Sequence, residues 1–291
     1  MLEQRFDEFN RHRRLLFSIA YRMLGSVADA EDVLQDAFVR WQQRPGDDVE
    51  SPRKFLVTVV SRLCLNYLNS ARIRRENYVG QWLPEPLVID STEPVEEFLA
   101  GESISMAFMV LLERLNPIER AVFILREVFE YDYADIASIV NRTEEHCRQI
   151  LHRAHQRVKR ERTGKPPSAG DHTNLLQSFL GAALHGDMDG LLRVLSQDVA
   201  LYADGGGKAR AIPNVVTGRD RVGRLLEGVF KKFVPPGATA RLMNVNGEPA
   251  IVASVGAQVV TLVAIEGTQR SIRNIFIISN PDKLAYLSHN L

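Results

Sequence analysis

Residues 132–162, DYADIASIVNRTEEHCRQILHRAHQRVKRER, predict two helices joined by a tight turn. Asp132 is a suitable N-cap for the first helix, and Asn141-Arg142 interrupts the apolar pattern that follows it. Thr143 then provides an N-cap for the second helix. The apolar stripe of the first helix consists of Tyr133, Ile136, Ala137 and Val140, and that of the second of Cys147, Ile150, Leu151, Ala154 and Val158. The outer face of the second helix carries Gln149, Arg153, Gln156, Arg157 and Arg160.

A short helix, a brief turn and a helix with a basic outer face are the parts of a helix-turn-helix. In that motif the second helix enters the major groove of DNA. The alternative is a helical hairpin whose charged face is simply solvated. This stretch alone does not decide between the two.

Length and charge limit the possible classes of protein. At 291 residues the chain is long enough for two or three domains. Lys and Arg together number 36, and Asp and Glu together also number 36, so the charges balance. The whole molecule is therefore not a generic binder of polyanions, and local basic patches matter more than the total charge.

Two cysteines and the absence of long apolar runs indicate the compartment. Cys64 and Cys147 lie far apart in helical patterns, which favours reduced thiols. His146 and His152 flank Cys147, but Cys147 belongs to the apolar stripe, so we expect no metal site and no cofactor. No signal peptide opens the chain and no apolar run reaches about 20 residues, so we expect a cytoplasmic protein without a membrane segment.

Three amphipathic helices are predicted in the first 79 residues. The first spans residues 5–24, and Ser26 caps the second, whose outer side shows Asp32, Gln35, Asp36 and Arg40. Ser51-Pro52 starts the third, with proline in the first turn. That helix ends in a basic run beside Tyr67 and Tyr78, which suits single-stranded nucleic acid or is a solvated helix end.

A linker separates these helices from the helix-turn-helix. Periodicity stops between Gly80 and about Gly101, where prolines and carboxylates gather. Within it Trp82-Leu83 would waste apolar area if exposed, so we expect this pair to dock on a folded surface. Helix resumes at about Glu102–Leu115, and residues 116–119 combine an N-cap, a first-turn proline and a capping-box acid.

Several of these motifs together resemble an extracytoplasmic-function sigma factor of the sigma-70 family. They are residues 30–38 (AEDVLQDAF), the long helix from Ser51, and Leu115-Asn116-Pro117 leading into residues 133–137 (YADIA). The resemblance implies two all-α sigma domains, region 2 and region 4. One departure is that Ser61 and Arg62 stand where many relatives have an Arg-Asn pair, which bears on the identity of the −10 sequence.

The resemblance also implies partners and site residues. The partners are promoter DNA and the RNA polymerase core, through its clamp-helix coiled coil and its flap. The residues implied for polymerase binding are Asp32, Gln35, Asp36 and Arg40. Those implied for the −10 element are Arg62, Asn66, Tyr67, Arg72, Arg74 and Arg75, and those for the −35 element are Glu145, Arg148, Gln149, His152, Arg153 and Arg157.

The chain after residue 170 follows a different pattern. Helices are predicted around residues 175–183, 191–195 and 220–233, and a strand over 199–202. Four β-like runs follow near 239–246, 250–256, 258–265 and 269–278, with Asn246-Gly247 as a hairpin turn. Helices followed by a curved antiparallel sheet indicate an α+β cone. The order resembles the SnoaL-like members of the nuclear-transport-factor-type (NTF2-like) fold.

Three short motifs narrow the resemblance to the SigJ-like group, the forty-first of these sigma factors. They are residues 82–86 (WLPEP), 204–208 (DGGGK) and 280–284 (NPDKL). In that group the C-terminal domain controls the sigma factor in cis. The residues implied for this interdomain regulation are Trp82, Leu83, Pro84, Asp204, Gly205, Gly206, Gly207, Lys208, Asn280, Pro281, Asp282 and Lys283.

The glycine run and the C-terminal cone each allow another interpretation. Glycines 205–207 before Lys208 lack the spacing of a phosphate loop, so a tight turn is favoured, and the flanking charges suggest a contact between domains. Between Thr239 and Ser279 the only carboxylates are Glu248 and Glu266, both beside turn glycines, and there is no histidine. Asp204 sits in the glycine turn, so catalysis is disfavoured. A small-molecule pocket lined by Met243, Val255, Leu262 and Phe276 stays open.

The sequence therefore predicts a promoter-specificity subunit of RNA polymerase that is not an enzyme. One alternative is a one-component DNA-binding regulator that senses a small molecule, and another is a cyclase with a DNA-binding appendage. Whether the last domain activates or inhibits stays open. We expect region 2 over residues 1–79, a linker over 80–100, region 4 over 101–163, a joint over 164–171 and the SnoaL-like domain over 172–291.

Overall fold

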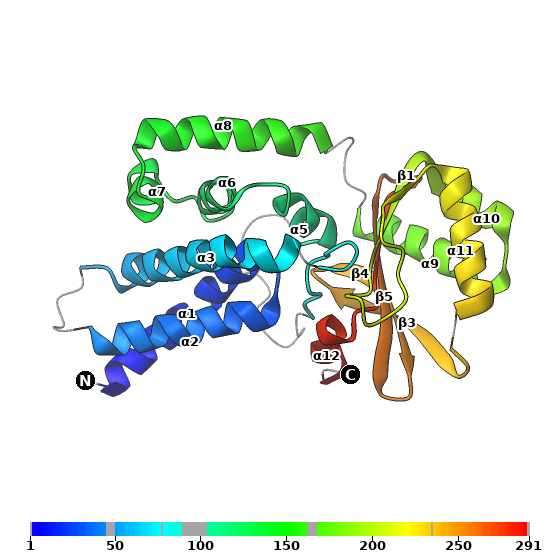
Figure 1. Ribbon diagram of the computed structural model, residues 1–291, viewed down its shortest axis with the longest axis horizontal. Helices are drawn as coiled ribbons and strands as arrows, with labels where there is room; N and C mark the ends of the chain where they lie inside the picture. Colours follow the sequence, from blue (N-terminus) through cyan, green and yellow to red (C-terminus); the bar gives the residue numbers. More distant parts are fainter. Residues whose placement is uncertain are drawn as a thin grey trace. The chain divides into compact units, whose positions relative to one another are not determined.

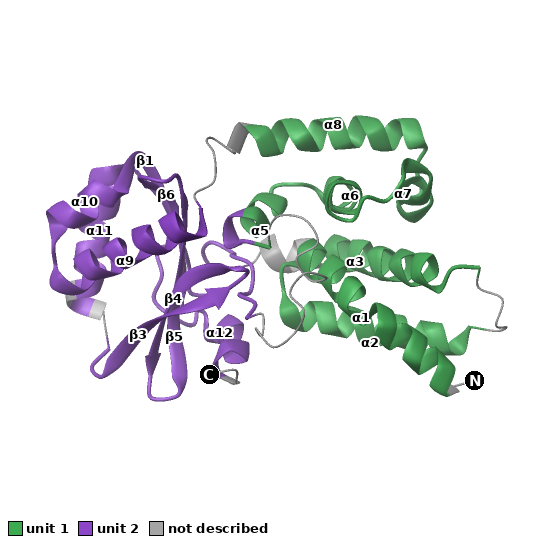
Figure 2. Ribbon diagram, turned by 180° about the vertical axis from the view of Figure 1, so that it is seen from behind, with its two compact units in different colours: residues 1–76, 90–104, 108–163 green, residues 77–89, 105–107, 164–291 purple. Residues whose placement is uncertain are grey.

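The computed structural model describes residues 2–44, 50–76, 78–88, 104–161, 168–233 and 235–289. The chain divides into two compact units, coloured separately in Figure 2. Unit 1 comprises residues 1–76, 90–104 and 108–163, and unit 2 comprises residues 77–89, 105–107 and 164–291. Unit 1 is helical, whereas unit 2 combines helices with one sheet.

Unit 1 begins with the three predicted helices, α1 (Leu2–Leu24), α2 (Val27–Gln43) and α3 (Pro52–Glu76). Gly25 ends α1 with φ of 68°, a left-handed conformation that glycine adopts without steric cost. Ser26 caps α2, since its side chain accepts a hydrogen bond from the Asp29 backbone N–H. The three helices pack on one another through their apolar stripes.

The helix-turn-helix is confirmed in α7 (Tyr133–Val140) and α8 (Glu144–Glu161). Asp132 caps α7, Asn141 forms the turn in the left-handed conformation, and Thr143 Oγ1 accepts the His146 N–H at 3.2 Å. α5 (Met106–Leu112) and α6 (Pro117–Phe123) precede them, and α6 has the predicted capping box of Asn116 and Glu119. A π-helix, η1 (Ile124–Val128), follows α6 and was not predicted.

Hydrogen bonds, an ion pair and a cation–π contact connect the first three helices of unit 1 to its helix-turn-helix part. Lys54 Nζ in α3 lies 2.9 Å from Asp135 Oδ2 in α7. Arg120 in α6 donates to the Met23 carbonyl at 2.7 Å, and its side chain is buried. The buried Arg22 guanidinium lies 5.4 Å from the centre of the Phe129 ring, and burial lowers the pKa of Arg22 to about 10. These contacts link the two helical parts of unit 1 in this structure.

Unit 2 contains one six-stranded sheet in the order β2-β1-β6-β5-β4-β3. The strands are β1 (Leu195–Asp204), β2 (Val216–Thr217), β3 (Ala238–Val245), β4 (Glu248–Val255), β5 (Gln258–Gly267) and β6 (Ile272–Ile278). Strands β3 to β6 are antiparallel, as predicted, with Asn246 and Gly247 both at positive φ in the β3–β4 turn. β1 runs parallel to β6, a pairing that the sequence did not indicate.

Helices cover both faces of this sheet. Figure 1 shows α9 (Ala169–His185), α10 (Met188–Val194) and α11 (Arg219–Phe233) on one side and α12 (Pro281–His289) on the other. The core between the sheet and helices α9, α10 and α11 contains Leu176, Phe179, Leu201, Val222, Leu226, Ile251, Val263, Ile265 and Ile275. Burial of these side chains is the main stabilising contribution to this unit.

The side chains expected to line a pocket do not gather on that core face. Ile251, Val263 and Ile275 belong to the core, and side chains alternate along a strand. Leu262 and Phe276 therefore point to the opposite face of the sheet, as does Met243 in the paired register. The pocket prediction named no face of the sheet, and Met243, Leu262 and Phe276 share one face, so the pocket stays a prediction.

Candidate functional site

The outer face of α2 carries the four residues expected to bind polymerase. Asp32, Gln35, Asp36 and Arg40 are all exposed. The opposite side of the same helix is buried through Val33, Leu34, Ala37 and other apolar residues. The four polar side chains lie at spacings of three and four residues, so they share one helix face. They are thus available to a partner and are not needed for the packing of α2.

The α3 face expected to meet the −10 element is partly engaged within unit 1. Arg62 donates through Nη2 to the Ser138 carbonyl at 2.7 Å and through Nε to the Ile139 carbonyl at 3.2 Å. Tyr67 is half-buried and its hydroxyl donates to Asp29. Asn66 is exposed. The side chains of Arg72, Arg74 and Arg75 lie outside the described residues.

The recognition helix α8 presents a continuous polar face. The exposed residues expected to read the −35 element are Glu145, Arg148, Gln149, His152 and Arg153. The opposite stripe is buried, with Cys147 and Ala154 fully enclosed. Arg157 is also exposed, but its Nη1 lies 2.7 Å from the buried carboxylate of Glu119. That ion pair was not apparent in the sequence, because the two residues are 38 positions apart.

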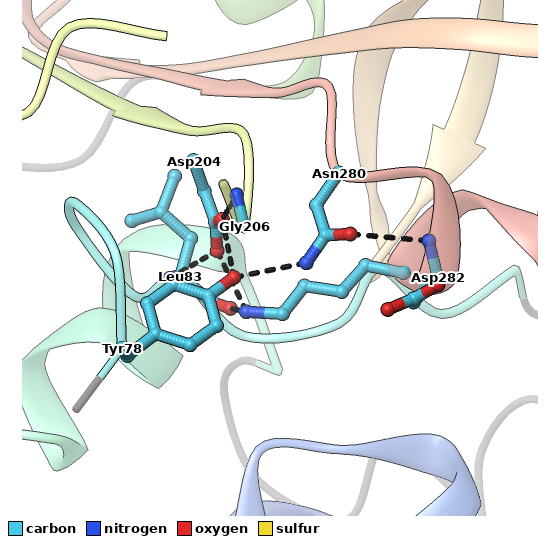
Figure 3. A network of polar contacts seen from close by, with 7 residues as sticks. Tyr78, Leu83, Asp204, Gly206, Asn280 and Asp282 are labelled. Atoms are coloured by element: carbon cyan, nitrogen blue, oxygen red, sulfur yellow. Dashed lines mark hydrogen bonds and ion pairs between the residues drawn. The ribbon is translucent and has the colours of Figure 1, made fainter. Parts of the chain in front are cut away.

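A second candidate site is a buried polar cluster in unit 2, which we call the Asp204 network. It consists of Tyr78, Leu83, Asp204, Gly206, Asn280 and Lys283. Figure 3 shows the labelled members Tyr78, Leu83, Asp204, Gly206 and Asn280. Asp204 is the last residue of β1, and its side chain is fully buried. The network brings together the three motifs 82–86, 204–208 and 280–284, which are far apart in the sequence.

Both carboxylate oxygens of Asp204 are fully used. Oδ1 accepts from the Tyr78 hydroxyl at 2.5 Å and from the Gly206 N–H at 3.0 Å. Oδ2 accepts from the Leu83 N–H at 2.8 Å and from Lys283 Nζ at 2.7 Å. A carboxylate has about four acceptor positions, so Asp204 has none left for a substrate proton. Asp204 therefore holds the cluster together and is not placed as a catalytic acid or base.

Lys283 is the cation of this network. Besides Asp204, its ammonium group donates to the Leu83 carbonyl. It lies 4.1 Å from the centre of the Trp82 ring and 5.1 Å from that of Tyr78. An ammonium over an aromatic face is stabilised by the ring quadrupole, the more so when water is excluded. Trp82 thus contributes through its ring face to a buried charge.

Tyr78 and Asn280 close the network. Asn280 Nδ2 donates to the Tyr78 hydroxyl at 2.9 Å, and Asn280 Oδ1 accepts the Asp282 N–H at 3.1 Å. Burial, together with the Asp204 carboxylate, raises the pKa of Tyr78. The helix start predicted at Asn280-Pro281 is present in α12. The sequence left open whether Tyr78 lies beside nucleic acid or at a solvated helix end, and it did not indicate this place in the network.

The glycine run fits this cluster closely. Gly206 has φ of 59°, and a β-carbon there would lie 2.3 Å from the Asn280 amide nitrogen. Gly207 has φ of 71° and faces Val79. Lys208 pairs with Asp282 at 2.6 Å on the exposed side. The predicted tight turn that allows close backbone approach is therefore present, and its neighbour is the 280–284 motif.

The segment 78–88 is held along unit 2 beyond the network. The Leu87 N–H donates to Asn246 Oδ1 at 3.0 Å, and the Leu87 carbonyl accepts from the Asn246 N–H at 2.7 Å. Val88 then forms an antiparallel bridge with Val245, the last residue of edge strand β3. Leu83, Pro84 and Glu85 are buried. This part of the expected linker is thus an ordered part of unit 2.

The described residues hold little that resembles a cofactor site. Among them, no group of three His, Cys, Asp or Glu side chains is placed to hold a metal ion. A pocket of about 190 Å³ lies between α9, α10 and α11, lined partly by His185, Asp187, Glu227 and Phe230. Within the described part of the chain, no helix is long and apolar enough to cross a membrane.

Comparison with known proteins agrees with this architecture. Sigma-70 region 2 matches residues 9–73, and sigma-70 region 4 matches residues 105–158. The chain is 37% identical to the ECF RNA polymerase sigma factor SigJ of Mycobacterium tuberculosis, over 95% of this chain and 92% of that protein. It is 32% identical to the probable sigma factor SigI of the same species, over 94% and 92%.

A solved structure covers the same extent. The crystal structure of Mycobacterium tuberculosis SigJ matches with a TM-score of 0.79 and 33% identity, covering 96% of this chain and 98% of that one. The fold of the helical sigma regions and of the C-terminal domain is therefore shared with that structure. The chain belongs to the extracytoplasmic-function sigma factors of the sigma-70 family. The resemblance to the SigJ-like group is confirmed.

Proposed function

We propose that this chain directs RNA polymerase to promoters, through the residues placed above, and that its C-terminal domain regulates it in cis. The observation that carries the first part is α8, which presents a polar, partly basic face on a helix-turn-helix and buries the other side. A helix of this kind reads base edges in the major groove. The alternative of a solvated helical hairpin is not favoured in a chain of this family.

Polymerase contact is assigned to the outer face of α2. Asp32, Gln35, Asp36 and Arg40 are exposed and carry charges that can pair with a partner surface. We assign this face to the clamp-helix coiled coil of the polymerase core, and region 4 to the flap. A one-component regulator would leave this polar face of α2 without a role.

The −10 element is assigned to α3. Asn66 is exposed, and Arg72, Arg74 and Arg75 follow at the basic end of the helix. Arg62 is bonded to two carbonyl groups of α7. DNA phosphates would have to replace those carbonyls, so the α3–α7 contact must separate before Arg62 reaches the promoter. The Tyr67 ring is assigned to stacking with an unpaired base, while the Tyr67 hydroxyl keeps its hydrogen bond to Asp29.

Cis regulation is assigned to the Asp204 network, because that network fixes the segment 78–88 to unit 2. This segment lies in the sequence between region 2 and region 4, so its attachment to unit 2 fixes part of the connection between the two DNA-binding regions. A change in that connection changes the effective concentration of region 4 near the −35 element. Attachment either braces the two regions at promoter spacing or holds them away from it.

A small-molecule ligand is not part of this proposal. The pocket of about 190 Å³ between α9 and α11 is smaller than the roughly 300–1,000 Å³ of typical ligand sites. Leu262 and Phe276, two of the side chains expected to line a pocket, lie on the face of the sheet opposite the core.

Run-off transcription with core polymerase on a genomic library tests the main proposal. Specific transcripts are expected only when core and this chain are both present, because each DNA-binding region contributes only part of the affinity. Tight, sequence-specific binding of the free chain in a mobility-shift assay would instead support a one-component regulator.

Trp82→Ala tests the regulatory part. The loss of the Trp82 ring removes the cation–π contact to Lys283, so promoter-directed transcription is expected to change while both units stay folded. Gln81→Ala is the matched control in the same segment, because Gln81 makes one long bond of 3.3 Å to Pro213. Equal transcription by parent and Trp82→Ala would show that the network serves folding only.

A further inference from the structure

Tyr133, the first residue of α7, holds two arginines beside its ring. The Arg148 guanidinium lies 4.7 Å from the ring centre, and that of Arg126 lies 5.0 Å from it. Arg148 comes from the recognition helix α8 and Arg126 from η1. One half-buried aromatic residue of α7 therefore contacts side chains from both η1 and α8.

The π-helix accounts for the position of Arg126. A π-turn inserts an extra residue and rotates the side chains that follow, and such turns are frequent at functional sites. After η1 the chain takes a left-handed residue, Glu130, with φ of 57°. Arg126 then donates to the Tyr131 carbonyl at 2.9 Å, which fixes its guanidinium next to Tyr133.

Arg148 is held from two sides. Its Nη2 donates to Glu144 at 2.9 Å, one helical turn earlier, while its guanidinium lies over the Tyr133 ring. The side chain is still 53% exposed, so its remaining N–H groups can reach an acceptor. A guanidinium has five donors in one plane, and a base edge accepts two of them at once. Holding the plane before binding reduces the entropy lost when those bonds form.

We propose that Tyr133 is a positioning residue for −35 recognition, which holds the Arg148 guanidinium against one base pair. This deepens the proposed function, since it rests on α8 being the reader of the −35 element. Arg148 lies in the first half of α8, and residues near the start of a recognition helix contact base edges. Guanine offers the O6 and N7 acceptors that a flat guanidinium matches.

The test is transcription by core polymerase with the full chain, on promoters selected by the parent from a library randomised in the −35 element. Tyr133→Leu is expected to lower discrimination at one base position by about fivefold, the size of one lost cation–π contact. Tyr133→Phe keeps the ring and is expected to retain the parental preference. Arg148→Ala is expected to relax the same position, and the double variant Tyr133→Leu/Arg148→Ala to match Arg148→Ala alone.

Two results would overturn the proposal. One is a uniform loss at all −35 sequences in Tyr133→Leu with the base preference intact, since that is the behaviour of a structural or phosphate-only residue. The other is additivity of Tyr133→Leu and Arg148→Ala. Failure of the proposed function is distinguishable, because then the parent itself selects no −35 sequence. Thermal unfolding of each variant controls for loss of the fold.

Discussion

Lys283 Nζ lies 2.7 Å from Asp204 Oδ2, and the Asp204 side chain of this ion pair is fully buried. The pair joins the end of β1 to α12, and the Lys283 ammonium also lies over the Trp82 ring. A charge in such a place requires its partner, because removing one member leaves the other uncompensated. The stability of unit 2 and the attachment of segment 78–88 thus depend on the same bond.

Lys283→Met is expected to lower the free energy of unfolding of unit 2 by roughly 3–5 kcal/mol, because Asp204 would keep a buried charge without its cation. Lys208→Met removes an exposed ion pair with Asp282 and is expected to cost less than about 1 kcal/mol. Urea denaturation followed by circular dichroism measures both. Equal costs for the two variants would contradict the buried pair.

Gly206→Ala is expected to destabilise unit 2 more than Gly256→Ala. Both glycines have φ of 59°, so both variants carry the roughly 1–2 kcal/mol cost of a left-handed alanine. Only at Gly206 does the new β-carbon meet Asn280, whereas no atom lies within 4 Å at Gly256. The added crowding corresponds to roughly 1–3 kcal/mol. Thermal unfolding compares the pair, and equal shifts would place Asn280 elsewhere.

Asp36→Arg is expected to weaken binding to core polymerase by roughly tenfold at low salt without unfolding the chain, since reversing a rim charge acts on association. Asp36 is exposed and the buried stripe of α2 does not include it. Asp189→Arg, an exposed charge reversal in α10, is the control. Titration of labelled core measures both, and unchanged affinity of the Asp36 variant would put the interface on another face.

Arg153→Ala is expected to reduce −35 recognition by about 1–3 kcal/mol at one base position if the arginine is bidentate to guanine. A phosphate contact would weaken all promoters evenly and lower the salt dependence. Arg224→Ala, an exposed arginine of α11, is the control. Identical transcription from matched and mutated −35 elements, in variant and parent alike, would show that Arg153 points away from DNA.

Glu248→Gln is expected to stabilise unit 2 at pH 8 but not at pH 4. Burial, with a smaller contribution from Glu266, raises the pKa of Glu248 from 4.5 to about 7 in the folded chain. Below pH 4.5 the carboxyl is protonated in both states, so it costs nothing. As the pH rises, the Glu248 carboxyl ionises first in the unfolded state, which lowers the free energy of unfolding of the parent. This loss of stability is complete above about pH 7. A stability difference between variant and parent that does not change with pH would contradict this.

Much of the fold was predictable because its signals are local. Each predicted helix cap accepts a hydrogen bond from a backbone N–H three positions later, so it is visible in a window of a few residues. These caps are Ser26, Asn116, Asp132 and Thr143. The Asn246-Gly247 turn fixes the β3–β4 hairpin for the same reason. The parallel pairing of β1 with β6 has no such signal, because it joins strands about 70 residues apart.

The candidate sites divide in the same way. Exposure of Asp36 and Arg153 follows from helix periodicity, so the sequence predicted it correctly. The engagement of Arg62 with α7 and of Arg157 with Glu119 did not follow, because any exposed arginine has the same local pattern whether or not a distant acceptor faces it. The place of Tyr78 did not follow for the same reason, since its partners Asp204 and Asn280 are more than 100 positions away.

The sequence by itself determined the order of sigma regions, the helix-turn-helix and the three motifs of the SigJ-like group. These depend on caps, apolar periods and short runs of specific residues, all of which act over one or two helical turns. Only the tertiary structure decided that Asp204, Lys283 and Leu83 share one buried cluster, and which face of the sheet Phe276 occupies. Those facts depend on long-range pairing, where the free energy of a buried bond selects a partner that local sequence does not specify.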